Sequence, residues 1–208
     1  MRRLSVLLIP LLLALAAPAW AGAPTDQLRQ YTDQVRKVLD DPALKEDGRR
    51  QERRTAVRKV AQEIFDVAET ARRALGPHWQ VRTPAEREEF VQLFADLLER
   101  TYIARIDQYG GEAVRYVGEA IDGEHAKVSA RIARKQGAEV TVEARMLRRG
   151  DRWLIYDVAI ENVSLISNYR SQFDRIVRTA SYRELVNRLK TKQHEFMNEK
   201  ASPASSSR

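Results

Sequence analysis

Residues 140–160, VTVEARMLRRGDRWLIYDVAI, carry the pattern from which the fold of this chain is predicted. Apolar side chains alternate with polar or opposite-facing ones in each half of the stretch, and Gly150-Asp151 separates the halves. A period of two sends alternate side chains to opposite faces of a strand, and glycine beside aspartate is typical of a tight turn. The stretch therefore predicts two antiparallel strands whose apolar faces are Val140, Val142, Ala144 and Met146, then Leu154, Tyr156, Val158 and Ile160.

The same alternation extends upstream. Val114 and Tyr116 have polar neighbours, and so do Val128, Ala130 and Ile132. Glycine-containing pairs separate these segments, and such pairs favour the turns of hairpins. The sequence therefore predicts a meander of four antiparallel strands.

Helical spacing of apolar residues surrounds the meander on both sides. A period near 3.6 predicts amphipathic helices that bury one face each. Thr83 and Glu86 form a capping-box pattern at the start of one of them, and Gly76-Pro77 is a typical helix stop. The helices are expected at residues 25–41, 49–75, 83–110, 164–177 and 182–189.

This order of elements indicates an α+β fold. We expect a twisted four-stranded antiparallel sheet, cone-like as in NTF2 and cystatin folds, covered by about five helices. Such a cone either fills with side chains or encloses an apolar pocket, and composition does not distinguish the two.

Both ends of the chain differ in composition from this domain. Arg2 and Arg3 precede an apolar run over residues 4–17, and Ala19-Trp20-Ala21 resembles a cleavage site. These features predict a signal peptide at residues 1–21, since the run is shorter than the ~20 residues that span a bilayer. We expect one domain over residues 22–190 and a polar, disordered tail over residues 191–208.

Composition excludes several kinds of chemistry. The 208 residues contain no cysteine, so the chain has no disulfides, thiolate metal sites or cysteine nucleophile. His78, His125 and His194 lack the spacing of metal ligands, and no phosphate-binding loop or nucleophile elbow is present. We therefore predict no catalytic residue and no metal site. Asp157 lies among apolar residues, but alternation places it opposite Tyr156 and Val158, which favours a structural or solvated carboxylate.

The formal net charge is +7, with basic and acidic residues interleaved along the helices. Interleaving is typical of solvated helix faces, and no aromatic motif for binding RNA accompanies it. We therefore expect no nucleic-acid partner.

Several separated blocks resemble the MlaC, or toluene-tolerance, family of periplasmic phospholipid-binding proteins. The most specific is WLIYDV at 153–158 running into ENVSLISNYRSQF at 161–173. Asn162 departs from the glycine expected there. The weaker blocks, in the family's order, are IFDVA at 64–68, ALGPHW at 74–79, TPAEREEF at 83–90, TY at 101–102 and YGGE at 109–112.

The resemblance implies a carrier that holds phospholipid acyl chains in an apolar pocket between a sheet and helices, with no cofactor besides this cargo. It implies exchange with the MCE-domain subunit of an inner-membrane ABC transporter and with an outer-membrane lipoprotein–porin complex, which maintains outer-membrane lipid asymmetry. It also implies a periplasmic location and no enzymatic activity. A branch of the family associated with hopanoids is equally compatible with these residues.

The predicted lipid-binding residues are apolar or aromatic positions of the strands and of two helices. The small Ala130 and Ala144 leave room where leucine fills space. Whether Tyr169 and Arg170 contact the headgroup, or Arg170 bonds to Asp157 or Glu161, stays open. The full set is Phe90, Phe94, Leu97, Leu98, Tyr102, Val128, Ala130, Ile132, Val140, Val142, Ala144, Met146, Tyr156, Val158, Tyr169 and Phe173.

Two alternatives remain at the level of sequence. A cone-shaped fold also hosts enzymes that act on apolar substrates, which require a carboxylate or histidine inside the cavity. An adaptor whose sheet face packs against a partner's helix is the other.

Overall fold

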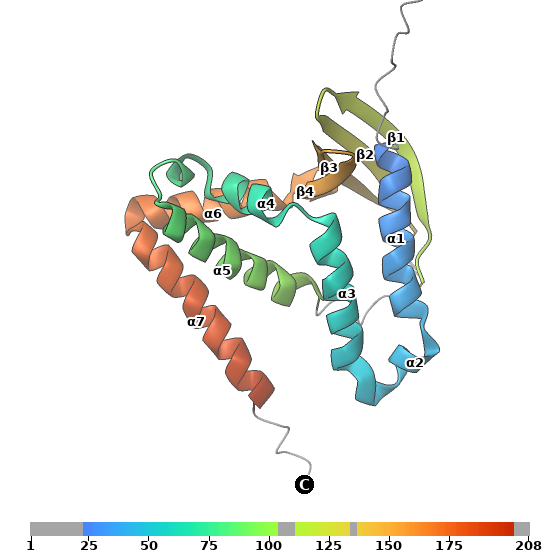
Figure 1. The fold of residues 1–208 in the computed structure, drawn as a ribbon, viewed down its shortest axis with the longest axis horizontal. Helices are drawn as coiled ribbons and strands as arrows, with labels where there is room; N and C mark the ends of the chain where they lie inside the picture. Colours follow the sequence, from blue (N-terminus) through green and yellow to red (C-terminus); the bar gives the residue numbers. More distant parts are fainter. Residues whose placement is uncertain (1–22, 104–110, 134–136, 202–208) are drawn as a thin grey trace, which may run out of the picture.

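The computed structural model describes residues 23–103, 111–133 and 137–201 (Figure 1). The predicted signal peptide, residues 1–21, lies outside the described residues. The helical elements are α1 (Pro24–Asp40), α2 (Pro42–Lys45), η1 (Asp47–Arg49), α3 (Arg50–Ile64), α4 (Val67–Leu75), η2 (Gly76–Trp79), α5 (Pro84–Ile103), α6 (Leu165–Thr179) and α7 (Tyr182–Ala201). The strands are β1 (Val114–Asp122), β2 (His125–Ile132), β3 (Val140–Arg149), β4 (Arg152–Ile160) and β5 (Val163–Ser164).

The strands form one antiparallel sheet in the order β1-β2-β3-β4-β5, which confirms the α+β class. The predicted count of four strands was one too few. The additional strand, β5, is two residues long and pairs with the end of β4 across a two-residue turn. Glu161 and Asn162 form that turn with φ values of +49° and +64°. Asparagine tolerates this left-handed region, so the turn forms without the glycine expected at position 162.

The predicted helix at residues 49–75 is two helices, because the chain leaves helical geometry at Phe65. Phe65 is extended and forms a parallel bridge with Ile155 of β4. Asp66 donates its backbone N–H to the Ile155 carbonyl at 2.9 Å, and its carboxylate caps α4 by accepting from the Glu69 N–H at 3.0 Å. This contact with the sheet overrides local helix propensity.

The helix ends partly agree with the predictions. The capping box at α5 is confirmed, since Thr83 N–H donates to Glu86 at 2.8 Å and Glu86 N–H donates to the Thr83 hydroxyl at 3.2 Å. The expected continuation of α5 through residue 110 lies outside the described residues. The expectation of a disordered tail from Thr191 is wrong for residues 191–201, where α7 continues.

Buried apolar residues form two separate clusters. The helical cluster lies between α4, α5, α6 and α7 and includes Phe90, Phe94 and Phe173. The sheet cluster lies between the sheet, α1 and α3 and includes Val128, Met146 and Ile155. Figure 1 shows α5, α6 and α7 on one side of the molecule and the sheet with α1 on the other, with α3 between α5 and α1. An ion pair between Arg58 and Glu99 joins α3 to α5.

A β-bulge at Tyr156 changes the alternation of β4. Arg145 pairs with Asp157, whereas Met146 pairs with Ile155, so Tyr156 has no partner on β3. The apolar face predicted for β4 is therefore wrong in its first half. Ile155, not Tyr156, lies on the same face of the sheet as Val158.

The bulge also turns Asp157 toward α6, where it is 4% exposed. One carboxylate oxygen accepts from the Ser164 hydroxyl at 2.6 Å and from Arg145 at 3.2 Å, and the other accepts from the Ile166 N–H at 3.1 Å. Of the two roles that the sequence left open for Asp157, structural or solvated, the structure shows the structural one, because these bonds attach the start of α6 to the sheet.

We predict that Asp157→Ala lowers the free energy of unfolding by about 3 kcal/mol, because it leaves buried donors without an acceptor. Denaturation by urea measures the change. Asp151→Ala, in the exposed turn between β3 and β4, is the matched control and is expected to change stability by less than about 0.5 kcal/mol. Equal losses in the two variants would contradict the role assigned to Asp157.

Candidate functional site

The face of the sheet that α1 and α3 cover, called here the inner face, is mostly apolar, apart from Arg148, which pairs with Trp153 near the turn between β3 and β4. Strand register aligns its side chains in rows that cross the sheet, and Glu119 is the only charged residue among the positions that follow. The rows are Val114, Ile132 and Val140; Tyr116, Ala130, Val142, Ile160 and Val163; Glu119, Val128, Ala144 and Val158; and Ile121, Ala126, Met146 and Ile155.

Helices cover only part of the inner face. Tyr31 of α1 and Ile64 of α3 pack against Val128, Met146 and Ile155, all of which are buried. The rows nearer the ends of β2 and β4 are more open, and this part is called here the open half. Its members Val114, Ile132, Val140 and Val142 are half-buried, and Ile160 is 50% exposed.

The predicted site residues of the strands divide between the two halves. Val128, Ala144 and Met146 are buried, with Val158 half-buried against them. Ala130 is buried beside the half-buried Val142 of the open half, which also includes Ile132 and Val140. Sequence alternation therefore identified the apolar face of β2 and β3 but not the boundary of its helical cover.

The predicted site residues of α5 and α6 mostly pack against one another. The Phe94 ring lies 5.4 Å from Phe173 and 5.1 Å from Tyr169, and Phe90 lies 5.7 Å from Phe173, centroid to centroid. Phe90 and Phe94 have no exposed surface. These aromatic rings form the centre of the helical cluster rather than a wall opposite the strands.

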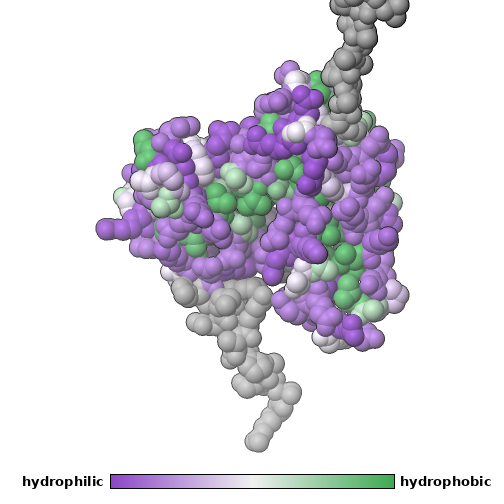
Figure 2. Space-filling model, viewed as in Figure 1, coloured by the Kyte–Doolittle hydropathy of each residue, from purple (hydrophilic) through white to green (hydrophobic). Residues whose placement is uncertain are grey.

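Further along α5, Leu97, Leu98 and Tyr102 are half-buried. Leu97 and Leu98 pack against the helical cluster. Figure 2 shows hydrophobic side chains gathered over α4 and α5 in the middle of the drawn face, and again between α1 and α3. The end of α5 is thus the part of this helix that keeps apolar surface accessible.

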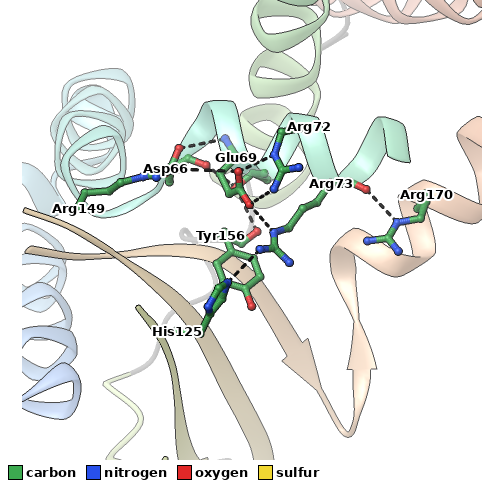
Figure 3. A network of polar contacts seen from close by, with 9 residues as sticks. Asp66, Glu69, Arg72, Arg73, His125, Arg149, Tyr156 and Arg170 are labelled. Carbon is green, nitrogen blue, oxygen red and sulfur yellow. Dashed lines mark hydrogen bonds and ion pairs between the residues drawn. The ribbon is translucent and has the colours of Figure 1, made fainter. Parts of the chain in front are cut away.

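A network of charged side chains joins α4 to the sheet. It could not be predicted from the sequence, because its residues belong to stretches in which acidic and basic residues are interleaved. Figure 3 shows Glu69 at its centre. Glu69 is 6% exposed and accepts from Arg72 at 2.6 and 2.7 Å and from Arg73 at 2.7 Å. Arg149 of β3 donates to Asp66 at 2.8 Å, beside this group.

The network continues onto β4 and α6. The Arg73 guanidinium lies 4.0 Å from the centroid of the Tyr156 ring, so Tyr156 contacts charge at the bulge. Arg170 donates to the Arg73 carbonyl at 2.9 Å and not to Asp157 or Glu161 (Figure 3). A Cβ at Gly76 would meet the Arg170 side chain at 3.3 Å. Arg170 therefore holds the end of α4 against α6.

The described residues contain no cluster of three or more histidines and carboxylates that could hold a metal ion. His78 is bonded to Asp174 at 2.9 Å, and His125 lies on an exposed strand end. Among the helices of the described ranges, none has the length and hydropathy to cross a membrane.

The fold defines this protein as an α+β protein with an antiparallel sheet whose apolar inner face is partly covered by helices. The family model described as MlaC protein matches residues 29–191. The chain therefore belongs to the MlaC protein family.

One solved structure shows the same fold. It is the phospholipid-binding protein from Ralstonia solanacearum in complex with a phospholipid, and it superimposes with a TM-score of 0.73 at 22% sequence identity. The match covers 83% of this chain and 98% of that chain.

Acid should weaken the ion pairs of Glu69, which belong to the network that joins α4 to the sheet. Hydrogen bonds from Arg72, opposed by burial and aided by Arg73, lower the pKa of the Glu69 carboxyl from 4.5 to about 2. A depressed pKa stabilises the fold above the unfolded value, and this stabilisation is lost as the pH falls from 4.5 toward 2. Because Arg72 is partly exposed, we predict that Glu69→Gln costs about 2 kcal/mol at neutral pH.

Chemical denaturation at neutral pH and at about pH 3 measures this effect. The difference in free energy of unfolding between wild type and variant should be smaller in acid. Glu184→Gln is the control, since Glu184 pairs with Arg188 at 2.7 Å on the exposed surface of α7. A gap that is independent of pH would rule out the charge of Glu69 as the cause.

Proposed function

We propose that this chain is a phospholipid carrier that holds acyl chains against the open half of the inner face. The observation that carries the proposal is the continuation of the apolar rows beyond their helical cover, from the buried Val128 to the half-exposed Ile160. Membership of the MlaC family and the phospholipid bound to the Ralstonia protein of the same fold support it.

The physical need for such a carrier follows from the cost of exposing hydrocarbon. Each CH₂ group left in water costs ~0.8 kcal/mol, so a chain of ~16 carbons costs on the order of 12 kcal/mol. A protein lowers this cost by supplying an uncharged wall along the chain. The open half is such a wall, since Val114, Ile132, Val140, Val142 and Ile160 carry no polar side-chain atoms.

We further propose that the carrier acts in the periplasm as part of an Mla-type system. There it exchanges phospholipid with the MCE-domain subunit of an inner-membrane ABC transporter and with an outer-membrane lipoprotein–porin complex. The signal-peptide pattern at residues 1–21 and the family support this location. A hopanoid-associated carrier of the same family is the second candidate for the cargo.

The proposed activity is binding rather than catalysis. The acid–base candidate singled out in the sequence, Asp157, points toward α6 and is occupied by bonds to Ser164, Arg145 and the Ile166 N–H. The residues of β4 that do lie on the inner face near it, Val158 and Ile160, are apolar. This arrangement supports a carrier over an enzyme of similar shape.

Native mass spectrometry of protein purified from a periplasmic extract tests the proposal. We expect a discrete added mass of one phospholipid that is released on denaturation, and a polypeptide mass lacking residues 1–21. Lipid extraction then distinguishes phospholipid from hopanoid. A clean apo mass, with no uptake from added phosphatidylethanolamine and phosphatidylglycerol vesicles, would contradict the carrier.

A matched pair of variants locates the cargo. Val142→Trp fills the open half and should abolish the adduct while circular dichroism stays native. Thr141→Trp, the neighbouring residue on the opposite face of β3, should retain the adduct. Loss of lipid from both variants, or from neither, would contradict binding at the inner face.

A further inference from the structure

One row of the inner face crosses all five strands, and the exposure of its side chains increases from β2 to β5. Directly paired residues place Tyr116, Ala130, Val142, Ile160 and Val163 side by side on β1 to β5. Ala130 is 5% exposed, Val142 is half-buried, Ile160 is 50% exposed and Val163 is 65% exposed. The row is therefore an uncharged track that runs from the interior to the surface.

The β1 end of the track is closed by α1. The Tyr116 hydroxyl donates to the Thr32 hydroxyl at 2.9 Å, and the Arg29 guanidinium lies 5.2 Å from the centroid of the Tyr116 ring. Burial raises the pKa of the Tyr116 phenol, so its hydroxyl stays protonated and keeps this bond at physiological pH. The Tyr116 ring therefore forms the closed end of the track.

The β5 end of the track is open and is fixed by the turn at Glu161 and Asn162. Both turn residues have left-handed backbones, which brings Val163 directly opposite Ile160. Glu161 holds the turn onto β3, because its N–H donates to the Thr141 carbonyl at 2.9 Å and its carboxylate accepts from the Thr141 N–H at 2.5 Å. Two exposed apolar side chains are thus held rigidly at the edge of the sheet.

The length of the track matches one acyl chain. Neighbouring strands lie ~4.8 Å apart, so four spacings between β1 and β5 give about 19 Å. The hydrocarbon core of a bilayer is ~30 Å thick, so one leaflet contributes about 15 Å. An extended chain of membrane length therefore fits across the strands between the Tyr116 ring and Val163.

We propose that this row is the path of one acyl chain, which enters over Ile160 and Val163 and ends with its methyl group at Tyr116. The inference rests on the proposed phospholipid-carrier function and adds the direction and the depth of the chain. It assigns the headgroup to the β5 side of the molecule. It also assigns the determinant of chain length to Ala130, next to the closed end.

Chain-length preference tests the depth of the path. Native mass spectrometry is run with single-chain lysophosphatidylglycerols of increasing length, from lauroyl to stearoyl. Ala130→Leu shortens the path, so binding of the stearoyl lipid should fall about tenfold while binding of the lauroyl lipid is retained. Ala126→Leu is the matched control, since Ala126 lies on the same strand and face, is also 5% exposed, and is off the track.

The rate of uptake tests the entrance. Val163→Asp places a charge where the chain enters and should slow uptake of fluorescent phosphatidylglycerol from vesicles at least about tenfold, since a charge in an apolar path is costly. Val117→Asp is the control, because Val117 is an exposed valine of the same sheet at 47% exposure that belongs to no row.

The outcomes separate the two proposals. Absence of any lipid on the wild-type protein overturns the carrier function itself. Lipid on the wild type, with Ala130→Leu and Ala126→Leu changing chain-length preference equally or not at all, overturns the path. Equal uptake rates for Val163→Asp and Val117→Asp overturn the entrance at β5.

Discussion

The pairing of β3 with β4 skips Tyr156, and most of the molecule depends on this one irregularity. On the N-terminal side of the bulge, Ile155 lies on the inner face with Met146 and joins the cluster beneath α1 and α3. On the C-terminal side of the bulge, Asp157 faces away from that cluster and binds the first turn of α6. If β4 were regular and Tyr156 paired with β3, strict alternation would send Ile155 to the face of the sheet that Asp157 now occupies.

Charged residues in this protein hold elements together and leave the inner face apolar. Asp157 fastens α6 to the sheet, and Glu69 with Arg72 and Arg73 fastens α4. Each buried carboxylate is paired, as its desolvation requires. These bonds attach α4 and α6, which belong to the helical cluster, to the sheet and leave the side chains of the open half without a charged neighbour in their own rows.

The division of the predicted site residues has a physical cause. Phe94 and Val142 are both apolar, so a sequence pattern predicts burial for both of them. In the structure Phe94 fills the helical cluster, whereas Val142 remains half-buried in the open half of the inner face, beyond the part that α1 and α3 cover. The break at Phe65 and the strand β5 were missed for a related reason, because both depend on pairing with β4 rather than on local propensity.

Several features could be predicted from the amino-acid sequence alone: the α+β class, the alternating faces of β2 and β3, the capping box of α5 and the blocks typical of the MlaC family. These features are local, since they depend on spacings of two to four residues and on side chains near one another in the chain. In contrast, the distinction between apolar residues that form a closed core and those that stay accessible follows from tertiary contacts. That distinction depends on how far α1 and α3 extend over the sheet, and contacts between distant segments set this extent.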